Sequence, residues 1–404
     1  MSTRLWWIVL GALFVLSAAL QRGPLAVFVL ILALATATSE LWARYCLSNV
    51  SYRRRLGVSQ IAFGEETSLA LEFVNAKPLP LAWLLVRDRF PPEVLLLTEK
   101  VRTGITQQST WLVNVVSLRW YERVTRTHRI VGARRGVFEF GPAELSSGDV
   151  LGFRRRQRQD DLAETLVVYP RIVPIAELGL PAGRPMGEWL AHRRIIEDPL
   201  RLAMVRDYAP GDNPRYIHWK ASAHTGHLQT KVFDPSDTLS LTIAVDVQTY
   251  PRAYEYVPEY LETILSAAGS LAVHALNERY MVGLCANGFG REGQNWEQIR
   301  PGRHPQQANL LLGMLAAVQP FRGISFETML YELLPNLPFG ATVVAISARP
   351  QEELYEALAT LEGAGHPSLL LTVGEDVPNV PVSLRTHHLG GRDVWQRLET
   401  LELA

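Results

Sequence analysis

The side chains best suited to acid–base or phosphoryl chemistry gather in residues 205–234, a segment denser in charge, aromatic rings and turn-forming residues than any other. Asp212, His218 and Lys220 supply a carboxylate, an imidazole and an ammonium group there. These groups are typical of general acid–base catalysis, so a hydrolase or nuclease-like enzyme is one alternative. No second metal-binding carboxylate accompanies them at a recognisable spacing. We therefore predict that the chain is not an enzyme.

Turn-forming and helix-capping residues in the same segment indicate how these side chains are positioned. Pro210 fixes φ at the first corner of a turn, and Gly211 tolerates positive φ at the second corner. Residues 212–214, Asp-Asn-Pro, then indicate a helix start, because Asp or Asn caps free amides and Pro fits the first helical position. We expect a short helix that ends near Gly226.

The expected helix carries polar residues at helical spacing. Arg215, His218 and Ser222 fall along one face at the i, i+3, i+7 spacing. A structural alternative is that Ile217 and Trp219 anchor the segment between two domains. We expect a rigid bridge that also exposes a charged docking face. The candidate docking residues are Arg206, Tyr208, Pro210, Gly211, Asp212, Arg215, His218, Trp219, Lys220, Ser222, Gly226 and Lys231.

The whole segment follows a long pattern, V-R-x-Y-x-P-G-D-x-x-R-x-I-H-W-K-A-S-A-x-T-G-x-L-x-x-K-x-F. This pattern closely resembles the signature of the bacterial family called domain of unknown function 58. The chain departs from the usual family pattern at His224, where Arg is common, and at Asp234, where Glu is common. Residues 135–142 and 148–153 resemble conserved elements that lie upstream in the family.

The resemblance implies partners rather than a reaction. Members of the family are commonly linked with MoxR-type AAA ATPases and with transglutaminase-like membrane proteins. The predicted function is that of a membrane-anchored adaptor or scaffold, with assembly or chaperone-like work at the cell envelope. No cofactor is expected.

Two apolar runs at the N-terminus, residues 5–20 and 25–39, are each a little short of the roughly twenty residues that span a bilayer. Aromatic residues at both ends extend the usable span. We expect a transmembrane helical hairpin over residues 1–48, with basic residues 53–55 on the cytoplasmic side of the inner membrane. The soluble domains would then lie in the cytoplasm. A cleaved signal peptide is the alternative, because residues 35–37, Ala-Thr-Ala, have small side chains at peptidase spacing.

Composition limits the classes of protein that this chain can belong to. The 404 residues are 48% hydrophobic and carry no net charge, with 40 Lys and Arg against 40 Asp and Glu. Neutrality argues against nucleic-acid binding, which usually requires a basic excess. The only cysteines, Cys46 and Cys285, exclude a disulfide framework and a cysteine-based zinc site.

Hydrophobic periodicity divides the rest of the chain. Residues 49–175 alternate with period two, which predicts an immunoglobulin-like β-sandwich. Residues 176–235 form the junction that contains the signature. Residues 236–404 alternate between strands and helices, which predicts a mostly parallel α/β sheet. The family resemblance implies that this part is a three-layer domain similar to the von Willebrand factor A fold.

Asp246 follows the first expected strand of that sheet, where ligands of α/β proteins collect. The resemblance implies a metal-dependent adhesion site of the form Asp-x-Ser-x-Ser, but Gln248 and Tyr250 stand at the hydroxyl positions. The later turn 347–349 reads Ser-Ala-Arg, and an Arg disfavours a divalent cation. We predict no bound metal and expect Asp246 to order a loop. A metal-dependent adhesion module with Asp246 as ligand remains an alternative.

Residues 288–293 match the dinucleotide-binding pattern G-x-G-x-x-G after an expected strand. The sequel contains Trp296, Pro301 and Pro305 rather than a helix start, and no acidic residue follows at the expected offset. We predict a flexible hairpin there and no nucleotide.

Overall fold

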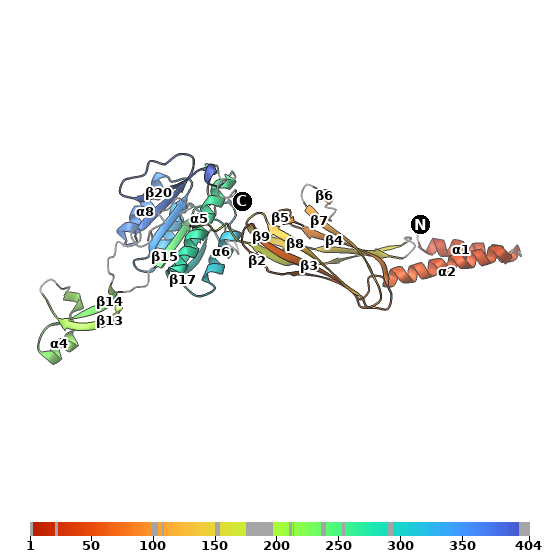
Figure 1. Cartoon of the computed structure of the whole chain (residues 1–404), viewed down its shortest axis with the longest axis horizontal. Coiled ribbons are helices and arrows are strands. Elements are labelled where there is room, and N and C mark those ends of the chain that lie inside the picture. Colours follow the sequence, from red (N-terminus) through yellow and green to blue (C-terminus); the bar gives the residue numbers. More distant parts are fainter. Residues whose placement is uncertain are drawn as a thin grey trace. The chain divides into compact units, whose positions relative to one another are not determined.

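The computed structural model describes residues 3–20, 23–97, 104–106, 109–149, 154–174, 197–209, 212, 214–235, 240–252, 255–289 and 294–395. The chain divides into two compact units, Met1–Val168 and Tyr169–Ala404. Figure 1 shows the elements of both. The finer division into four parts stays a prediction.

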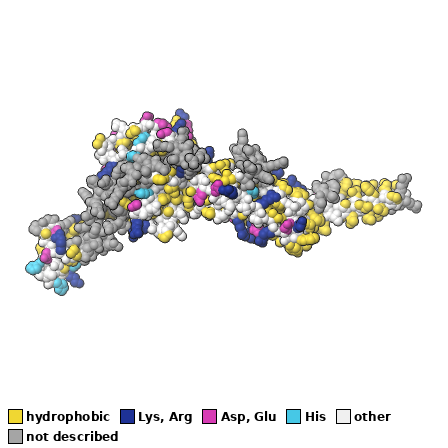
Figure 2. Space-filling model, in the orientation of Figure 1, with side chains coloured by type: hydrophobic (Ala, Val, Ile, Leu, Met, Phe, Trp, Pro, Cys, Tyr) yellow, Lys and Arg dark blue, Asp and Glu magenta, His cyan; other side chains and the backbone are white. Residues whose placement is uncertain are grey.

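Two apolar helices, α1 (Thr3–Ala19) and α2 (Gly23–Tyr45), begin the chain. At 1.5 Å per residue they extend about 26 and about 35 Å, against about 30 Å for the hydrocarbon core of a bilayer. Within the described residues, only α2 is long and apolar enough to cross a membrane. Hydrophobic side chains cover much of this helix pair (Figure 2). One anchoring helix is therefore supported, whereas the second pass of the expected hairpin is not.

Polar contacts join α2 to the sheets that follow it. The Lys77 ammonium donates to the carbonyl oxygens of Cys46 at 2.6 Å and Ser48 at 2.7 Å, just beyond the end of the helix. Burial lowers the pKa of Lys77 to about 8. The Ser39 hydroxyl donates to Asp149 at 2.9 Å. The Lys77 cation is favourably placed at the helix C-terminus. Together with the Ser39 contact, it connects α2 to the sheets.

Among the residues that the structure describes up to Val168, twelve strands follow, and most of them lie in two antiparallel sheets. The first sheet has the order β1-β3-β8-β5 and the second the order β11-β10-β4-β7-β6, while β2, β12 and β9 form a small third sheet. The strands are β1 (Val50–Leu56), β2 (Gln60–Ile61), β3 (Glu66–Asn75), β4 (Leu81–Phe90), β5 (Val94–Leu96), β6 (Gly104–Thr106), β7 (Ser109–Leu118), β8 (Arg123–Gly132), β9 (Gly136–Phe140), β10 (Ala143–Gly148), β11 (Arg155–Asp160) and β12 (Glu164–Val168).

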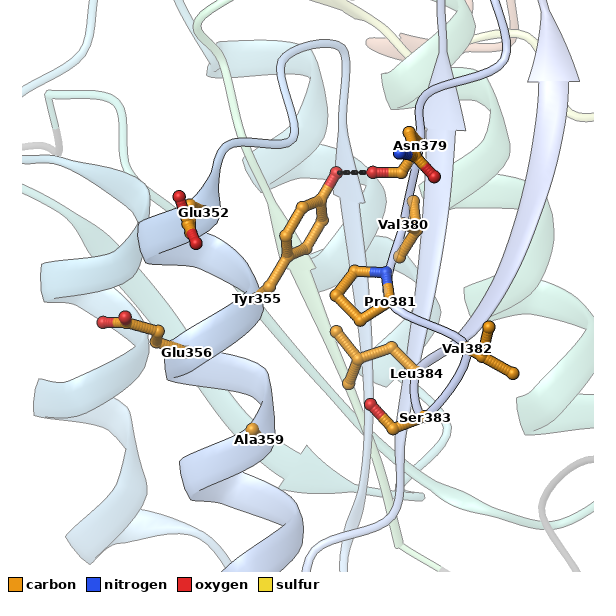
Figure 3. Close-up of a pocket in the computed structure, with 10 residues that line it drawn as sticks. All are labelled: Glu352, Tyr355, Glu356, Ala359, Asn379, Val380, Pro381, Val382, Ser383 and Leu384. Atoms are coloured by element: carbon orange, nitrogen blue, oxygen red, sulfur yellow. Dashed lines mark hydrogen bonds between the residues drawn. The ribbon is translucent and has the colours of Figure 1, made fainter.

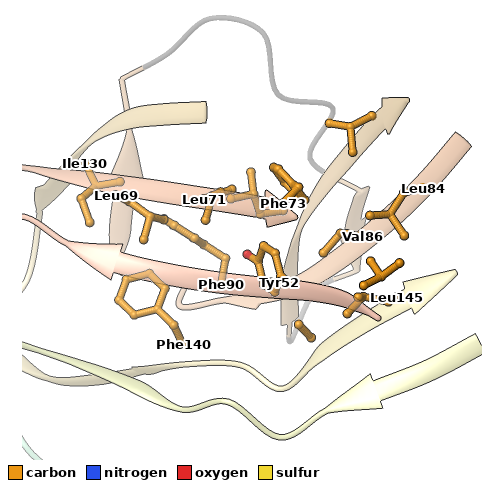
Figure 4. Close-up of a cluster of buried hydrophobic side chains, with 14 of the residues drawn as sticks. Tyr52, Leu69, Leu71, Phe73, Leu84, Val86, Phe90, Ile130, Phe140 and Leu145 are labelled. Carbon is orange, nitrogen blue, oxygen red and sulfur yellow. The ribbon is translucent and has the colours of Figure 1, made fainter. Parts of the chain in front are cut away.

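The two larger sheets share one hydrophobic core. Leu71 and Phe73 of β3 and Leu84 and Val86 of β4 are all fully buried in it. Figure 4 shows these side chains between the strands. The alternation that predicted strands with one buried face is confirmed here, because every second residue of such a strand points inward.

The same alternation places the middle one of the basic residues 53–55 in the core, while the side of the membrane on which these residues lie stays a prediction. Arg54 lies on the inner face of β1 with Tyr52, and its guanidinium donates to Asp88 at 2.8 Å. The Tyr52 hydroxyl donates to the other oxygen of Asp88 at 2.6 Å. Burial raises the pKa of Asp88 to about 6, although Arg54 and Tyr52 both lower it. Arg54 is thus part of the sandwich core and is not available to a membrane surface.

Ahead of β15 in the sequence lies a segment that we call the signature hairpin. It consists of β13 (Glu197–Asp207), η2 (Pro214–Tyr216), α4 (Trp219–Thr225) and β14 (Gln229–Pro235). β13 and β14 pair antiparallel, and both η2 and α4 contact β14. The expected helix is shorter than predicted, because a 3-10 turn occupies its first residues. Its end is confirmed, since Gly226 has a φ of 73° at the C-cap.

A six-stranded sheet completes the chain, in the order β17-β16-β15-β18-β19-β20. All neighbours pair parallel except β17, which pairs antiparallel with β16. The strand order therefore reverses between β15 and β18, as the predicted α/β class allows. The elements are β15 (Ser240–Val245), α5 (Pro258–Asn277), β16 (Met281–Ala286), β17 (Glu297–Gly302), α6 (Gln307–Ala317), α7 (Phe326–Leu333), η4 (Leu334–Asn336), β18 (Thr342–Ser347), α8 (Glu352–Gly363), β19 (Ser368–Val373) and β20 (Arg385–Gly390).

Helices pack onto this sheet in two pairs. α5 contacts α6 and the strands β15 and β16, while α7 contacts α8. Ala244 of β15, Leu330 of α7 and Leu358 of α8 belong to one buried cluster. The helices around the sheet are visible in Figure 1. This packing holds the strand ends, and the loops after them, in fixed positions.

Candidate functional site

Asp212 of the signature hairpin closes a turn between charged and backbone groups. One of its oxygens accepts from the Arg206 guanidinium at 2.7 Å, and the other accepts from the Ala209 amide at 2.9 Å. The hydrogen bond from Arg206 lowers the pKa of Asp212. The Tyr208 hydroxyl donates to the carbonyl oxygen of Asp212 at 3.3 Å. The carboxylate therefore orders the loop that leaves β13.

His218 caps α4 with its ring. The Nδ1 atom accepts from the Ala221 amide at 3.0 Å, so this nitrogen carries no proton in the capped helix. The His218 amide donates to the carbonyl oxygen of Gln229 at 2.7 Å. Ser222 donates to the carbonyl oxygen of His218 at 3.1 Å and accepts from the Gln229 amide at 2.9 Å. His218 and Ser222 together fasten α4 to β14.

These contacts do not assemble the predicted hydrolase residues. The hydrogen bonds of Asp212 go to Arg206 and Ala209, and that of the His218 ring goes to Ala221. Within the described part of the hairpin, no hydrogen bond or ion pair joins Asp212, His218 and Lys220. The arrangement holds a loop and a helix in place.

The hairpin leaves a large aromatic side chain in solvent. None of the residues of α4, all of which the structure describes, is buried, and Trp219 is 69% exposed. Lys220 beside it is exposed as well, and so is Leu228 at 50%. Arg206 and Arg215 are also exposed, whereas Lys231 is half-buried. The expected docking residues Pro210 and Gly211 lie outside the described residues.

Asp246 lies at the point where the strand order of the α/β sheet reverses. Its Oδ1 atom accepts from the Asn287 amide group at 2.9 Å and from the Gln248 backbone amide at 3.0 Å. Its Oδ2 atom accepts from the Ser347 hydroxyl at 2.7 Å. We call Asp246, Gln248, Asn287 and Ser347 the sheet-edge network.

The sheet-edge network is buried and closely connected. Asn287 and Ser347 are fully buried, and Asp246 is 5% exposed. Asn287 also accepts from the Val247 amide at 2.8 Å, and Ser347 accepts from the Arg349 amide at 3.0 Å. Burial raises the pKa of Asp246 and nearby Glu327 raises it further, against the hydrogen bonds that lower it.

This geometry bears on the metal-site alternative. Both oxygens of Asp246 already accept from protein donors, and a metal ion would have to displace them. Gln248 uses its side-chain oxygen to accept from Arg322 at 2.7 Å. Among the described residues, no group of three His, Cys, Asp or Glu side chains is arranged to hold a metal.

The sequence reasoning missed Asn287 and Ser347 as partners of Asp246. A signal for both was present, because Asn287 directly follows β16 and Ser347 ends β18. The carboxyl ends of parallel neighbours meet at one edge of a sheet, so polar residues that follow those strands come close together. Of the G-x-G-x-x-G segment, the structure describes only Gly288 and Phe289.

A pocket of about 640 Å³ lies elsewhere in this domain, between α8 and the segment that precedes β20. Figure 3 shows Tyr355 reaching across it to donate to the carbonyl oxygen of Asn379 at 3.5 Å. Glu352 and Glu356 lie on α8 at its edge, and Pro381 lies opposite. No residue predicted from the sequence lines this pocket.

Two solved structures resemble parts of the chain too weakly to carry an argument. One is the CARDB domain of a protein from Pyrococcus furiosus, at 10% identity and a TM-score of 0.20, covering 30% of this chain and 91% of that one. The other is the native conformation of alpha-2-macroglobulin from E. coli, at 16% identity and a TM-score of 0.23. The match covers 31% of this chain and 7% of that one.

Sequence comparison is more informative. The uncharacterised protein YeaD of Bacillus subtilis is 24% identical over 257 residues, which are 61% of this chain and 58% of that relative. The chain thus spans little more than half the length of this relative. The family described as "Protein of unknown function DUF58" matches residues 204–360, a range that contains most of the signature hairpin and the whole sheet-edge network.

Proposed function

We propose that this protein is a membrane-anchored adaptor that uses the signature hairpin to dock onto a partner protein. The observation that carries the proposal is the exposed Trp219, at 69%, beside the exposed Lys220 on a helix that buries no residue. Trp is the residue most often responsible for binding energy at protein interfaces. Its ring supplies a large, rigid contact area once a partner covers it.

The local contacts of the hairpin support docking over catalysis. Arg206 with Asp212, and His218 with Ser222, fix the shape of the loop and of α4. A preformed shape loses less conformational entropy on binding than a flexible one. No observation favours the hydrolase, the nuclease or the metal-dependent adhesion module.

The family resemblance suggests the partner and the location. A MoxR-type AAA ATPase is the proposed partner of the hairpin, and a transglutaminase-like membrane protein belongs to the same assembly. Anchoring through α2, with α1 packed beside it as a second pass, would place both units in the cytoplasm. We further propose that the sandwich is immunoglobulin-like and that the α/β sheet, with its one antiparallel edge strand, is similar to a three-layer von Willebrand factor A domain.

The test compares two tryptophans of nearly equal exposure. Trp219 of the hairpin is 69% exposed and Trp120, between β7 and β8, is 68% exposed. The full chain is purified in detergent together with the proposed MoxR-type ATPase partner. We expect Trp219→Ala to reduce the amount of ATPase that co-purifies by about tenfold or more. Trp120→Ala should leave it unchanged. Equal binding by the two variants would refute the docking role of the hairpin.

A further inference from the structure

Two arginines, Arg322 before α7 and Arg349 after β18, contact the loop that follows β15, beside the sheet-edge network. Arg322 donates through Nη1 to the side-chain oxygen of Gln248 at 2.7 Å. Arg349 donates through Nη1 to the carbonyl oxygen of Tyr250 at 3.4 Å, and Gln248 Nε2 donates to the same carbonyl oxygen at 3.0 Å. One glutamine side chain and one carbonyl group therefore connect the two guanidinium groups.

Neither arginine has an acidic partner in the described part of the chain. Their side-chain hydrogen bonds go to neutral oxygens, whereas Arg252, two residues after Tyr250, pairs with Glu255 at 3.1 Å. A guanidinium group has five N–H donors, and each of these two uses one in the contacts above. Most of their hydrogen-bonding capacity is left for a ligand.

Backbone contacts hold the segment that carries Arg322. Arg322 forms an isolated β-bridge with Gly288, and the amide of the next residue, Gly323, donates to the carbonyl oxygen of Asn287 at 2.7 Å. A side chain at position 323 would come within 2.0 Å of the Asn295 carbonyl oxygen, so only glycine allows this approach. Glycine at this position thereby fixes the place of Arg322.

The second arginine is held by the network itself. The Arg349 amide donates to the Ser347 hydroxyl oxygen, and that hydroxyl donates to Asp246. Arg322 is connected to the same network through Asn287, whose amide group donates to Asp246 at 2.9 Å. The buried carboxylate thus positions two cationic side chains at the edge of the sheet. Preorganisation of this kind is typical of binding sites.

We propose that Arg322 and Arg349 bind a carboxylate group of an acidic side chain on a partner protein. The planar guanidinium matches a carboxylate through paired N–H donors. The site lies where the strand order reverses, which is where ligands of α/β sheets bind. Glu327 places negative charge beside the sheet-edge network, and this favours a singly charged carboxylate over a doubly charged phosphate. The exposed ring of Tyr250 supplies apolar contact at the rim.

This binding requires no metal ion, because the arginines supply the positive charge. It is independent of the proposed docking role of Trp219, since the two surfaces consist of different residues. A partner with acidic side chains can engage the sheet edge even if the signature hairpin binds nothing.

The experiment measures binding of short peptides to the full chain in nanodiscs of neutral lipid, by surface plasmon resonance at low salt. The probe is a glycine-flanked peptide with two adjacent glutamates, and its control carries two glutamines. We expect the double variant Arg322→Gln, Arg349→Gln to weaken binding of the glutamate peptide at least about tenfold. Arg252→Gln, which removes an exposed arginine outside the site, should not change it.

Two further arms decide the chemistry. The double variant Arg322→Lys, Arg349→Lys keeps both positive charges but loses the paired N–H donors of the guanidinium groups. Binding of the glutamate peptide should therefore weaken several-fold. Inorganic phosphate should compete with the peptide no better than glutarate does. The proposal is overturned if the wild type prefers neither peptide, if the glutamine variant binds as the wild type does, or if phosphate competes better.

Discussion

The signature hairpin and the sheet-edge network use the same kinds of side chain in opposite ways. Asp212 is half-buried, and its oxygens pair with Arg206 and a backbone amide close by in sequence. Asp246 is 5% exposed, and its three donors come from three different segments of the chain. The hairpin concentrates its polar groups in sequence, whereas the sheet edge concentrates them in space. A dense run of polar residues therefore indicates local structure more readily than it locates a buried network.

Among the variants that test this difference, Asp246→Ala has the largest expected effect. The change would leave the donors of Asn287 and Ser347 buried without acceptors, at a cost of about 2–5 kcal/mol in the local stability of the sheet. Hydrogen–deuterium exchange of peptides from β15 and β18 measures this loss. Asp212→Ala is the matched control, and it should leave those peptides unchanged because its contacts lie within the hairpin. If β15 were protected from exchange equally in Asp246→Ala and the wild type, the structural role of the network would be contradicted.

The sequence predicted the buried elements well, because burial leaves a periodic pattern. Asp246 was expected to follow a strand, and β15 ends directly before it at Val245; the G-x-G-x-x-G segment was also expected to follow a strand, and β16 ends two residues before it at Ala286. β17 was missed because Pro301 and Gly302 are unusual in a strand. It lies at the antiparallel edge of the sheet, where a proline without an amide proton is tolerated.

Periodicity alone did not pair Asp246 with residues that are distant in sequence. Asp246 was identified as a strand-end residue, but Ser347 lies 101 residues away. Only the strand order brings these two residues together, and periodicity does not determine strand order. Arg54 illustrates a related limit, since a charged residue in an arginine run gives no sign that a buried carboxylate will pair with it.

Opposite pH dependence is the second test of the comparison. Burial raises the pKa of Asp246, so the folded sheet keeps a proton that the unfolded chain releases, and stability falls as pH rises from about 4 through the raised value. Arg206 lowers the pKa of Asp212, so its contribution is present above about pH 4 and is lost as pH falls through the lowered value.

Hydrogen–deuterium exchange, measured between pH 3 and pH 7 and corrected for intrinsic rates, distinguishes the contributions of the two aspartates to stability. Asp246→Asn should abolish the pH dependence of β15 alone, and Asp212→Asn that of the hairpin alone. Parallel pH profiles for β15 and the hairpin in the wild-type protein would contradict the assignment of opposite shifts.

The smallest expected effect is at the cap of α4. His218→Ala removes the acceptor of the Ala221 amide and should lower the protection of α4 by about 1 kcal/mol. His218→Asn should retain most of the protection, because asparagine is among the best N-cap residues. Exchange at labelling times of seconds measures both variants, since α4 buries no residue and opens readily. If His218 were instead a catalytic base, neither variant would need to affect α4, and the two would be equally inactive. A graded loss of helix protection, with asparagine close to the wild type, therefore distinguishes a capping histidine from a reactive one.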